Sequence, residues 1–178
     1  MDVAIAQEPS PADALLEGIR LLDLEFLPYV PCSTAARVLS EVSRWPTVSV
    51  FPVTKEEEGV GILCGHLLAG RRSALLMQDT GFGNALTALL TFAQPYHLPT
   101  VLIATRTGGA GEINSAVPDY SERLPSVLGA AGLYHVLLDA RLPLEQWPSE
   151  IDALARYART SHRPVIVLAD LKRRGTSA

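Results

Sequence analysis

Short apolar runs alternate along the chain with longer segments whose apolar residues follow helical spacing. The runs with no polar alternation are typical of strands covered on both faces. They predict six strands, at residues 26–30, 47–53, 73–78, 100–105, 134–138 and 164–168. The segments between them predict helices at 9–22, 33–44, 55–69, 82–92, 122–131 and 144–160, with Ser10 as the first N-cap.

This alternation predicts a parallel sheet with helices on both faces. We expect an α/β fold with three α/β/α layers and a mostly parallel sheet of about six strands. A single domain covers residues 1–178, with an ordered core at about 9–170 and flexible ends. Ligands bind such sheets at the carboxyl ends of the strands. That rule selects four segments for their chemistry, at 31–33, 54–58, 79–84 and 106–114.

Composition excludes several classes of protein. Hydrophobic residues make up 48% of the 178 residues, enough for one well-buried domain. The net charge of −4 offers no basic surface for nucleic acid. No apolar stretch is long enough for a membrane span and no signal peptide is visible, so we expect a cytoplasmic protein. Cys32 and Cys64 lack metal-ligand spacing, so we expect no metal site in this chain.

Two glycines, Gly81 and Gly83, follow the buried strand at 73–78 in the sequence QDTGFGN. Glycines at the start of a helix let a ligand approach the backbone, but they serve a tight turn equally well. A dinucleotide fingerprint would need a third glycine at position 86, which is leucine. A plain nucleotide-binding protein is therefore disfavoured.

Three consecutive glutamates, residues 56–58, begin the helix predicted at 55–69. Carboxylates in a first turn complement the helix dipole, which would explain them without any function. The same helix contains Gly59, Gly61 and Gly65, although glycine is a poor helix former. Close packing against another helix would account for the glycines. We therefore expect a carboxylate at a tightly packed helix start near an interface.

These segments resemble the pyrimidine-binding domain of sulfopyruvate and phosphonopyruvate decarboxylases, which depend on thiamine diphosphate. The resemblance covers about residues 30–138. It rests on EEEGVGI, ALLMQDTGFGN, the stretch at 96–99, the arginine after TVLIAT and VPCST near position 31. The family favours Gln-Asn-Ser-Gly-x-Gly-Asn, so Asp79 and Thr80 are departures. The resemblance implies the pyrimidine-binding type of the thiamine-diphosphate-binding fold.

The resemblance also implies how the site works. In this family a glutamate hydrogen-bonds the pyrimidine ring of thiamine diphosphate and activates the cofactor for attack on a 2-oxoacid. The family's spacing before a small residue selects Glu57 for this catalytic role, ahead of Glu56 and Glu58. The turn would bind the cofactor beside it, through residues Thr80, Gly81, Phe82, Gly83 and Asn84.

Single-chain relatives hold magnesium and the diphosphate with a Gly-Asp-Gly motif in a second domain. This sequence contains no such motif. The resemblance therefore implies a separate diphosphate-binding beta subunit that carries the motif and the magnesium. We expect a hetero-oligomer of at least α2β2, with the active site between subunits.

The expected substrate is a small anionic 2-oxoacid, either 3-sulfopyruvate or 3-phosphonopyruvate. Arg106 is the first candidate for its anionic end, and its alternative is a structural pair. Cys32 and Ser33 are further candidates, although Ser33 is also a good N-cap. Two other functions stay open, a carboligase that forms acyloins and a non-catalytic scaffold subunit. The sequence does not choose between sulfonate and phosphonate, nor does it indicate the pathway.

Overall fold

The computed structural model describes residues 9–109 and 112–172. Its centre is a six-stranded sheet in which every pairing is parallel, in the order β2-β1-β3-β4-β6-β5. The predicted α/β class and parallel sheet are therefore confirmed. The strands are β1 (Phe26–Tyr29), β2 (Ser49–Pro52), β3 (Leu75–Gln78), β4 (Val101–Thr105), β5 (Tyr134–Leu138) and β6 (Val165–Ala169).

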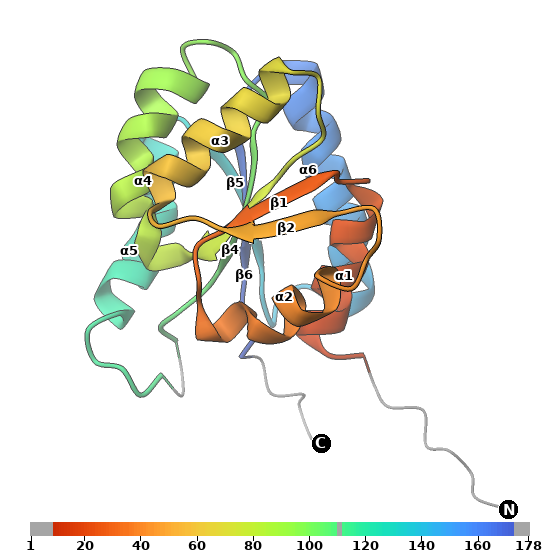
Figure 1. Cartoon of the computed structure of the whole chain (residues 1–178). Helices are drawn as coiled ribbons and strands as arrows, with labels where there is room; N and C mark the ends of the chain where they lie inside the picture. Colours follow the sequence, from red (N-terminus) through yellow and green to blue (C-terminus); the bar gives the residue numbers. More distant parts are fainter. Residues whose placement is uncertain (1–8, 110–111, 173–178) are drawn as a thin grey trace, which may run out of the picture.

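Helices cover both faces of this sheet, so the three predicted layers are present (Figure 1). One face carries α1 (Pro11–Leu21), α2 (Ala36–Val42) and α6 (Trp147–Ser161), and the other carries α3 (Glu56–Leu68), α4 (Phe82–Ala88) and α5 (Pro118–Ala130). Neighbouring residues of β3 serve opposite cores, because side chains alternate along a strand. Leu76 packs with the first group of helices, and Leu75 and Met77 pack with the second.

The sequence located most elements correctly but misjudged some helix starts. Ser10 is confirmed as the N-cap of α1, where it forms a capping box with Asp13. Ser33 is not a cap: it opens a short 3-10 turn, and neither that turn nor α2 has a side-chain cap. Helix α5 begins at Pro118, four residues before the prediction, because proline suits the first helical turn.

Proline interrupts the sheet between β1 and β3. The backbone N–H groups of Phe26 and Val30 donate to Arg72 and Leu76 on the β3 side. Pro28 stands midway between them on the same side of the strand and has no N–H to donate. Pairing between these two strands is accordingly short, with Tyr29 opposite Leu76 and one isolated bridge at Phe26.

The glycines of α3 have different surroundings. A Cβ on Gly59 would lie 2.6 Å from Leu75, so this glycine lets the helix approach the sheet closely. Gly61 and Gly65 meet no atom of the described chain within 4 Å of that position. The expected close packing against another helix of this chain therefore does not explain them. The ends predicted to be flexible, 1–8 and 173–178, lie outside the described residues.

Candidate functional site

The carboxyl ends of the six parallel strands meet at one edge of the sheet. Four of the segments that follow them carry the side chains expected to be functional: 31–33 after β1, 54–58 after β2, 79–84 after β3 and 106–114 after β4. The strand order places β1, β3 and β4 side by side at the centre of this edge. Residues 110–111 of the last segment lie outside the described part of the chain.

Glu56, the first residue of α3, lies directly against the turn after β3. A Cβ built on Gly81 would be 2.3 Å from Glu56 Oε1, so only glycine fits beneath this carboxylate. Asn84 completes the contact, because its Nδ2 donates to Glu56 Oε2 at 2.8 Å. The Glu56 side chain is half-buried. The turn and the helix start therefore form one unit around a single carboxylate.

The structure places Glu57 at the solvent side of the helix start, and its catalytic role stays a prediction. Its side chain is 44% exposed and points to Lys55, whose Nζ is 3.9 Å from Glu57 Oε1. At 100° per residue, Glu56 falls in the middle of the buried stripe of this helix, which consists of Gly59, Val60, Leu63 and Cys64. Glu57 falls at its margin. Helical phase was therefore the sequence signal that could have identified Glu56.

The other residues of the turn have separate roles. Phe82 is a buried core residue packed with α3 and α5, so its ring does not line an open site. Thr80 Oγ1 accepts a 2.6 Å hydrogen bond from Gln78 Nε2. Gly83 and Asn84 are exposed at the start of α4. Of the five turn residues expected to bind cofactor, Gly81 and Asn84 are the ones placed directly against Glu56.

Asp79 is fully buried beneath this turn and joins three segments. Its carboxylate accepts from Thr107 through the backbone N–H at 3.0 Å and the hydroxyl at 2.8 Å. Ser121 Oγ donates to it at 2.5 Å from the first turn of α5. A buried carboxylate needs donors on all sides, and these groups provide them. Asp79 stands where the family favours asparagine, and its carboxylate is therefore satisfied by three hydrogen bonds within this structure.

Tyr120 is a residue of this edge that the sequence gave no reason to select. It stands beside Ser121 in α5, and its phenol oxygen would be 3.7 Å from a Cβ on Gly83. The pKa of Tyr120 is raised, chiefly by burial. The Gly83 backbone opposes this shift, and the charges of Asp79 and Glu56 add to it to a smaller extent. The phenol therefore lies beside the turn at Gly83. Such a contact depends on tertiary packing and has no local motif.

Arg106 follows β4 as expected but turns toward α5. Its Nη2 donates to the backbone oxygen of Ser121 at 3.0 Å. Its Nε is buried and has no partner among the described residues. The pKa of Asp139 is lowered chiefly by hydrogen bonds from Arg141 and to a smaller extent by the charge of Arg106. Substrate binding by Arg106 stays a prediction, and its guanidinium already has structural contacts.

Cys32 joins a small polar group between the ends of β1, β3 and β4. Its Sγ is 3.3 Å from Thr105 Oγ1 and 3.6 Å from Gln78 Oε1. Ser33 is exposed at the same end of the sheet. A role of either residue toward substrate stays a prediction. Cys64, by contrast, is a core residue whose pKa is raised to about 11 by burial, so it has no thiolate chemistry near neutral pH.

Glu112 organises the loop after β4. Its carboxylate accepts backbone N–H groups of Gly108, Ile113 and Asn114, each at 3.0 Å, and it pairs with Lys172 beyond β6. The hydrogen bond from Lys172 is the main reason that the pKa of Glu112 is lowered to about 2, and the amides of Asn114 and Gly108 add to it. This residue therefore ties the loop to the end of the neighbouring strand.

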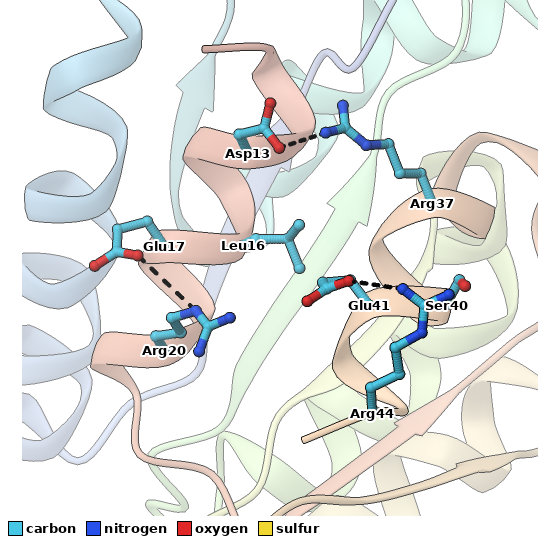
Figure 2. A pocket seen from close by; sticks show the side chains of 8 residues that line it. All are labelled: Asp13, Leu16, Glu17, Arg20, Arg37, Ser40, Glu41 and Arg44. Carbon is cyan, nitrogen blue, oxygen red and sulfur yellow. Dashed lines mark hydrogen bonds and ion pairs between the residues drawn. The ribbon is translucent and has the colours of Figure 1, made fainter. Parts of the chain in front are cut away.

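Two hollows of the described surface lie away from this edge. A groove of about 410 Å³ between α1 and α2 is lined mainly by charged residues (Figure 2). Its charges neutralise one another in three exposed pairs, Asp13–Arg37, Glu17–Arg20 and Glu41–Arg44. Another hollow, of about 430 Å³, lies at the amino ends of the strands. Neither lies at the edge that carries Glu56.

Two features are absent from residues 9–109 and 112–172. No group of three or more His, Cys, Asp or Glu side chains in these residues could hold a metal ion. No helix in the same described part has the length and apolar composition that a membrane crossing requires.

No family model matches the chain, but several proteins of known function are similar to it in sequence. The chain is 35% identical over 105 residues to the sulfopyruvate decarboxylase subunit alpha of Methanothermobacter thermautotrophicus. That alignment covers 59% of this chain and 64% of the relative. The corresponding subunit of Methanocaldococcus jannaschii is 28% identical over 148 residues, with 82% of both chains covered. A phosphonopyruvate decarboxylase of Streptomyces viridochromogenes is 30% identical over 98 residues, which cover 55% of this chain and 25% of the relative.

A similar solved structure is that of the 2-oxoglutarate:ferredoxin oxidoreductase from Magnetococcus marinus. It superposes with a TM-score of 0.65 at 18% identity, over 91% of this chain and 29% of that one. The likeness concerns the fold alone.

The structure defines an α/β domain with a six-stranded parallel sheet, a fold that it shares with this oxidoreductase. The resemblance found in the sequence is confirmed, since the chain is similar to the sulfopyruvate decarboxylase alpha subunits and to phosphonopyruvate decarboxylase.

Proposed function

We propose that this chain is the pyrimidine-binding alpha subunit of a thiamine-diphosphate-dependent 2-oxoacid decarboxylase. Its substrate is 3-sulfopyruvate or 3-phosphonopyruvate, and its products are the corresponding aldehyde and carbon dioxide. The observation that carries this proposal is the contact of Glu56 with Gly81 and Asn84 at the carboxyl edge of the sheet. The relatives named sulfopyruvate and phosphonopyruvate decarboxylase support the same reaction.

The residues of this edge fit the pyrimidine end of the cofactor. A half-buried carboxylate at a helix start can exchange a proton with a ring nitrogen, and a glycine turn lets a flat ring approach the backbone. Asn84 holds one oxygen of Glu56, which fixes the orientation of the carboxylate. We therefore assign to Glu56 the proton-relaying role that the sequence analysis gave to Glu57.

When bound, thiamine diphosphate supplies the electron sink that carbon dioxide loss from a 2-oxoacid requires. This chain contributes groups that bind and orient. Glu56 holds or releases a proton at the pyrimidine nitrogen, and Asn84 keeps the carboxylate aligned. Gly81 leaves space for the Glu56 carboxylate and for the Asn84 side chain. Asp79 fixes the turn from below through Thr107 and Ser121.

A partner subunit would hold the diphosphate and the magnesium. The described residues offer no cluster of metal ligands for that end of the cofactor. Helix α3, which begins at Glu56, leaves Gly61, Gly65 and Leu68 uncovered, and Leu68 is 67% exposed. A helix that is apolar on its outer face as well as its inner one is normally buried. A diphosphate-binding subunit docked along α3 would cover this face and close the site beside Glu56.

The test begins with the reading frames beside the gene for this chain, one of which should encode a subunit with a Gly-Asp-Gly motif. The two subunits are co-expressed and purified together. Carbon dioxide release from 3-sulfopyruvate and 3-phosphonopyruvate is then measured with and without thiamine diphosphate. Glu56→Gln should lower turnover at least about 100-fold, since positioned acid–base groups contribute 10²–10⁴.

Glu57→Gln is the matched control and should keep most of the activity, because its side chain faces solvent and Lys55. Loss in Glu57→Gln with normal turnover in Glu56→Gln would return the role to Glu57. Acyloin formation on adding an aldehyde, without release of the free aldehyde product, would favour the carboligase. Turnover by this chain alone would refute the split between subunits.

A further inference from the structure

Helices α3 and α4 differ from the other α-helices of the described chain in the charge of their outer faces. Residues 59–70 and 80–105, which contain α4 and all of α3 beyond its first turn, have no Asp, Glu, Lys or Arg. Helices α1, α2, α5 and α6 each carry both acidic and basic residues. A helix face in contact with water is normally charged or polar. The layer formed by α3 and α4 (Figure 1) therefore has the composition of a surface that another molecule covers.

Two large side chains project from this layer at the end that lies away from Glu56. Leu68, the last residue of α3, is 67% exposed. Tyr96, which follows the π-helical turn η3 (Leu89–Ala93) at the end of α4, is 68% exposed. The ring of Phe92 packs edge-on against the Tyr96 ring with centroids 5.5 Å apart, so the tyrosine is supported by its own chain. Aromatic side chains presented in this way are enriched at the centres of protein interfaces.

The polar groups along this layer already have partners within the chain. Thr91 Oγ1 donates to the backbone oxygen of Thr87 at 2.7 Å, although the Thr91 side chain is exposed. Asn84 Nδ2 donates to Glu56. Covering a polar group costs about 1–3 kcal/mol when its hydrogen bond is lost. These hydrogen bonds stay in place when the layer is covered, so a partner can bury it without that cost.

The candidate site indicates which partner covers this layer. Glu56 begins α3, and Gly81 and Asn84 lie at the start of α4, so a subunit that closes the site must meet both helices. Resting on the proposed function, we infer that the diphosphate-binding subunit covers α3 and α4 together, from Glu56 to Leu68 and Tyr96. Tyr96 anchors this contact at the end of the layer farthest from the chemistry. The partner's matching surface is apolar and uncharged, because a charge buried against this layer would meet no countercharge.

The test measures the Kd between the full chain and the Gly-Asp-Gly subunit by calorimetry, with the two subunits prepared separately. Tyr96→Ala should raise this Kd at least about tenfold, as truncation of an interface aromatic commonly does. Thr91→Arg, which puts a charge in the middle of the layer, should raise it at least as much. Tyr157→Ala is the matched control and should leave the Kd unchanged, because Tyr157 is 42% exposed on α6 and packs against Tyr134. The Tm of each isolated variant should stay within about 2 °C, as expected for surface substitutions.

An unchanged Kd in both Tyr96→Ala and Thr91→Arg would overturn the inference, because α4 would then lie outside the contact. An equal loss of affinity in Tyr157→Ala would also overturn it, because the opposite layer would then contribute as much. If the natural chain binds no such subunit, or if turnover of the complex needs no thiamine diphosphate, the proposed function fails instead. A subunit that binds every variant equally and is active with thiamine diphosphate refutes this inference alone.

Discussion

The carboxylate of Glu56 occupies the space that a side chain at position 81 would fill. A Cβ there would be 2.3 Å from Oε1 and 2.6 Å from the carboxyl carbon. The backbone at Gly81 has an ordinary φ of −71°, so other residues could adopt its conformation. Glycine is required here for space, and the requirement comes from a residue 25 positions earlier in the sequence.

Gly81→Ala should separate function from stability. The atoms in the way, from Cγ to Oε1, belong to one flexible side chain, so Glu56 can swing aside at a folding cost of about 1 kcal/mol, the low end for overpacking. The displaced carboxylate would lose Asn84 and its place on the turn. We expect thiamine diphosphate binding and turnover to fall at least about tenfold while the Tm changes little. Gly129→Ala, an exposed glycine of α5 with open space around it, serves as control.

The pairing of Asp79 with Thr107 predicts that two substitutions of Asp79 change the free energy of unfolding by different amounts. Asparagine can aim its oxygen at the Thr107 amide, and the threonine hydroxyl can turn to accept from the new NH₂ group. Asp79→Asn should therefore change the free energy of unfolding by less than about 1 kcal/mol. Asp79→Ala would leave the Thr107 amide buried and unpaired, at a cost of about 1–3 kcal/mol. Denaturant unfolding of both variants measures the difference, and equal losses would contradict the geometry.

The uncovered face of α3 predicts that one substitution can raise the stability of the isolated chain and lower its affinity for the partner subunit. Gly65→Ala adds a methyl group that meets nothing in the chain and improves helix propensity by about 0.5–1 kcal/mol. Its Tm should rise in the isolated subunit, whereas affinity for the partner should fall. Gly59→Ala is the contrasting variant: its Cβ would collide with Leu75 and lower the Tm. Unaltered affinity in Gly65→Ala would remove α3 from the interface.

Glu112 makes stability depend on acid pH. Its pKa is lowered from 4.5 to about 2, mainly by Lys172, so the unfolded chain binds its proton more readily than the folded one. The stabilisation is complete above about pH 4.5 and is lost as the pH falls toward 2. The Tm advantage of the natural chain over Glu112→Gln should shrink across this interval. A constant advantage from pH 5.5 to pH 2.5 would show that the carboxylate charge is not responsible.

The fold followed from local patterns because buried parallel strands and amphipathic helices leave strong signals. The apolar strand at 100–105 and the capping serine at position 10 needed no tertiary information. The start of α5 was missed because Pro118 closes a glycine-rich loop and looked like its end. Local sequence shows where a chain bends, but not on which side of the bend a helix begins.

The site was harder to predict for a different reason. The sequence located the turn with Gly81 and Asn84 and the glutamate cluster opposite it. The choice between neighbouring glutamates required the phase of α3, which the spacing to Gly59 alone did not reveal. Tyr120 and Ser121 could not be selected at all, because Tyr120 meets Gly83 and Ser121 meets Asp79, each more than thirty residues away. Contacts of that kind are determined by packing and not by motif.

The proline in β1 gives the sheet one weakly bonded seam. β2 is joined to the rest of the sheet through β1, and residues 53–55 lead from β2 straight into Glu56. Amide hydrogens of β1 and β2 should therefore exchange with deuterium sooner than those of β4 and β6. The strand pair that delivers the carboxylate can then shift slightly as a whole while the centre of the sheet stays rigid. In a complex with a partner subunit, the part of this edge that follows β1 and β2 would adjust to the partner, whereas the part that follows β4 and β6 would keep its position.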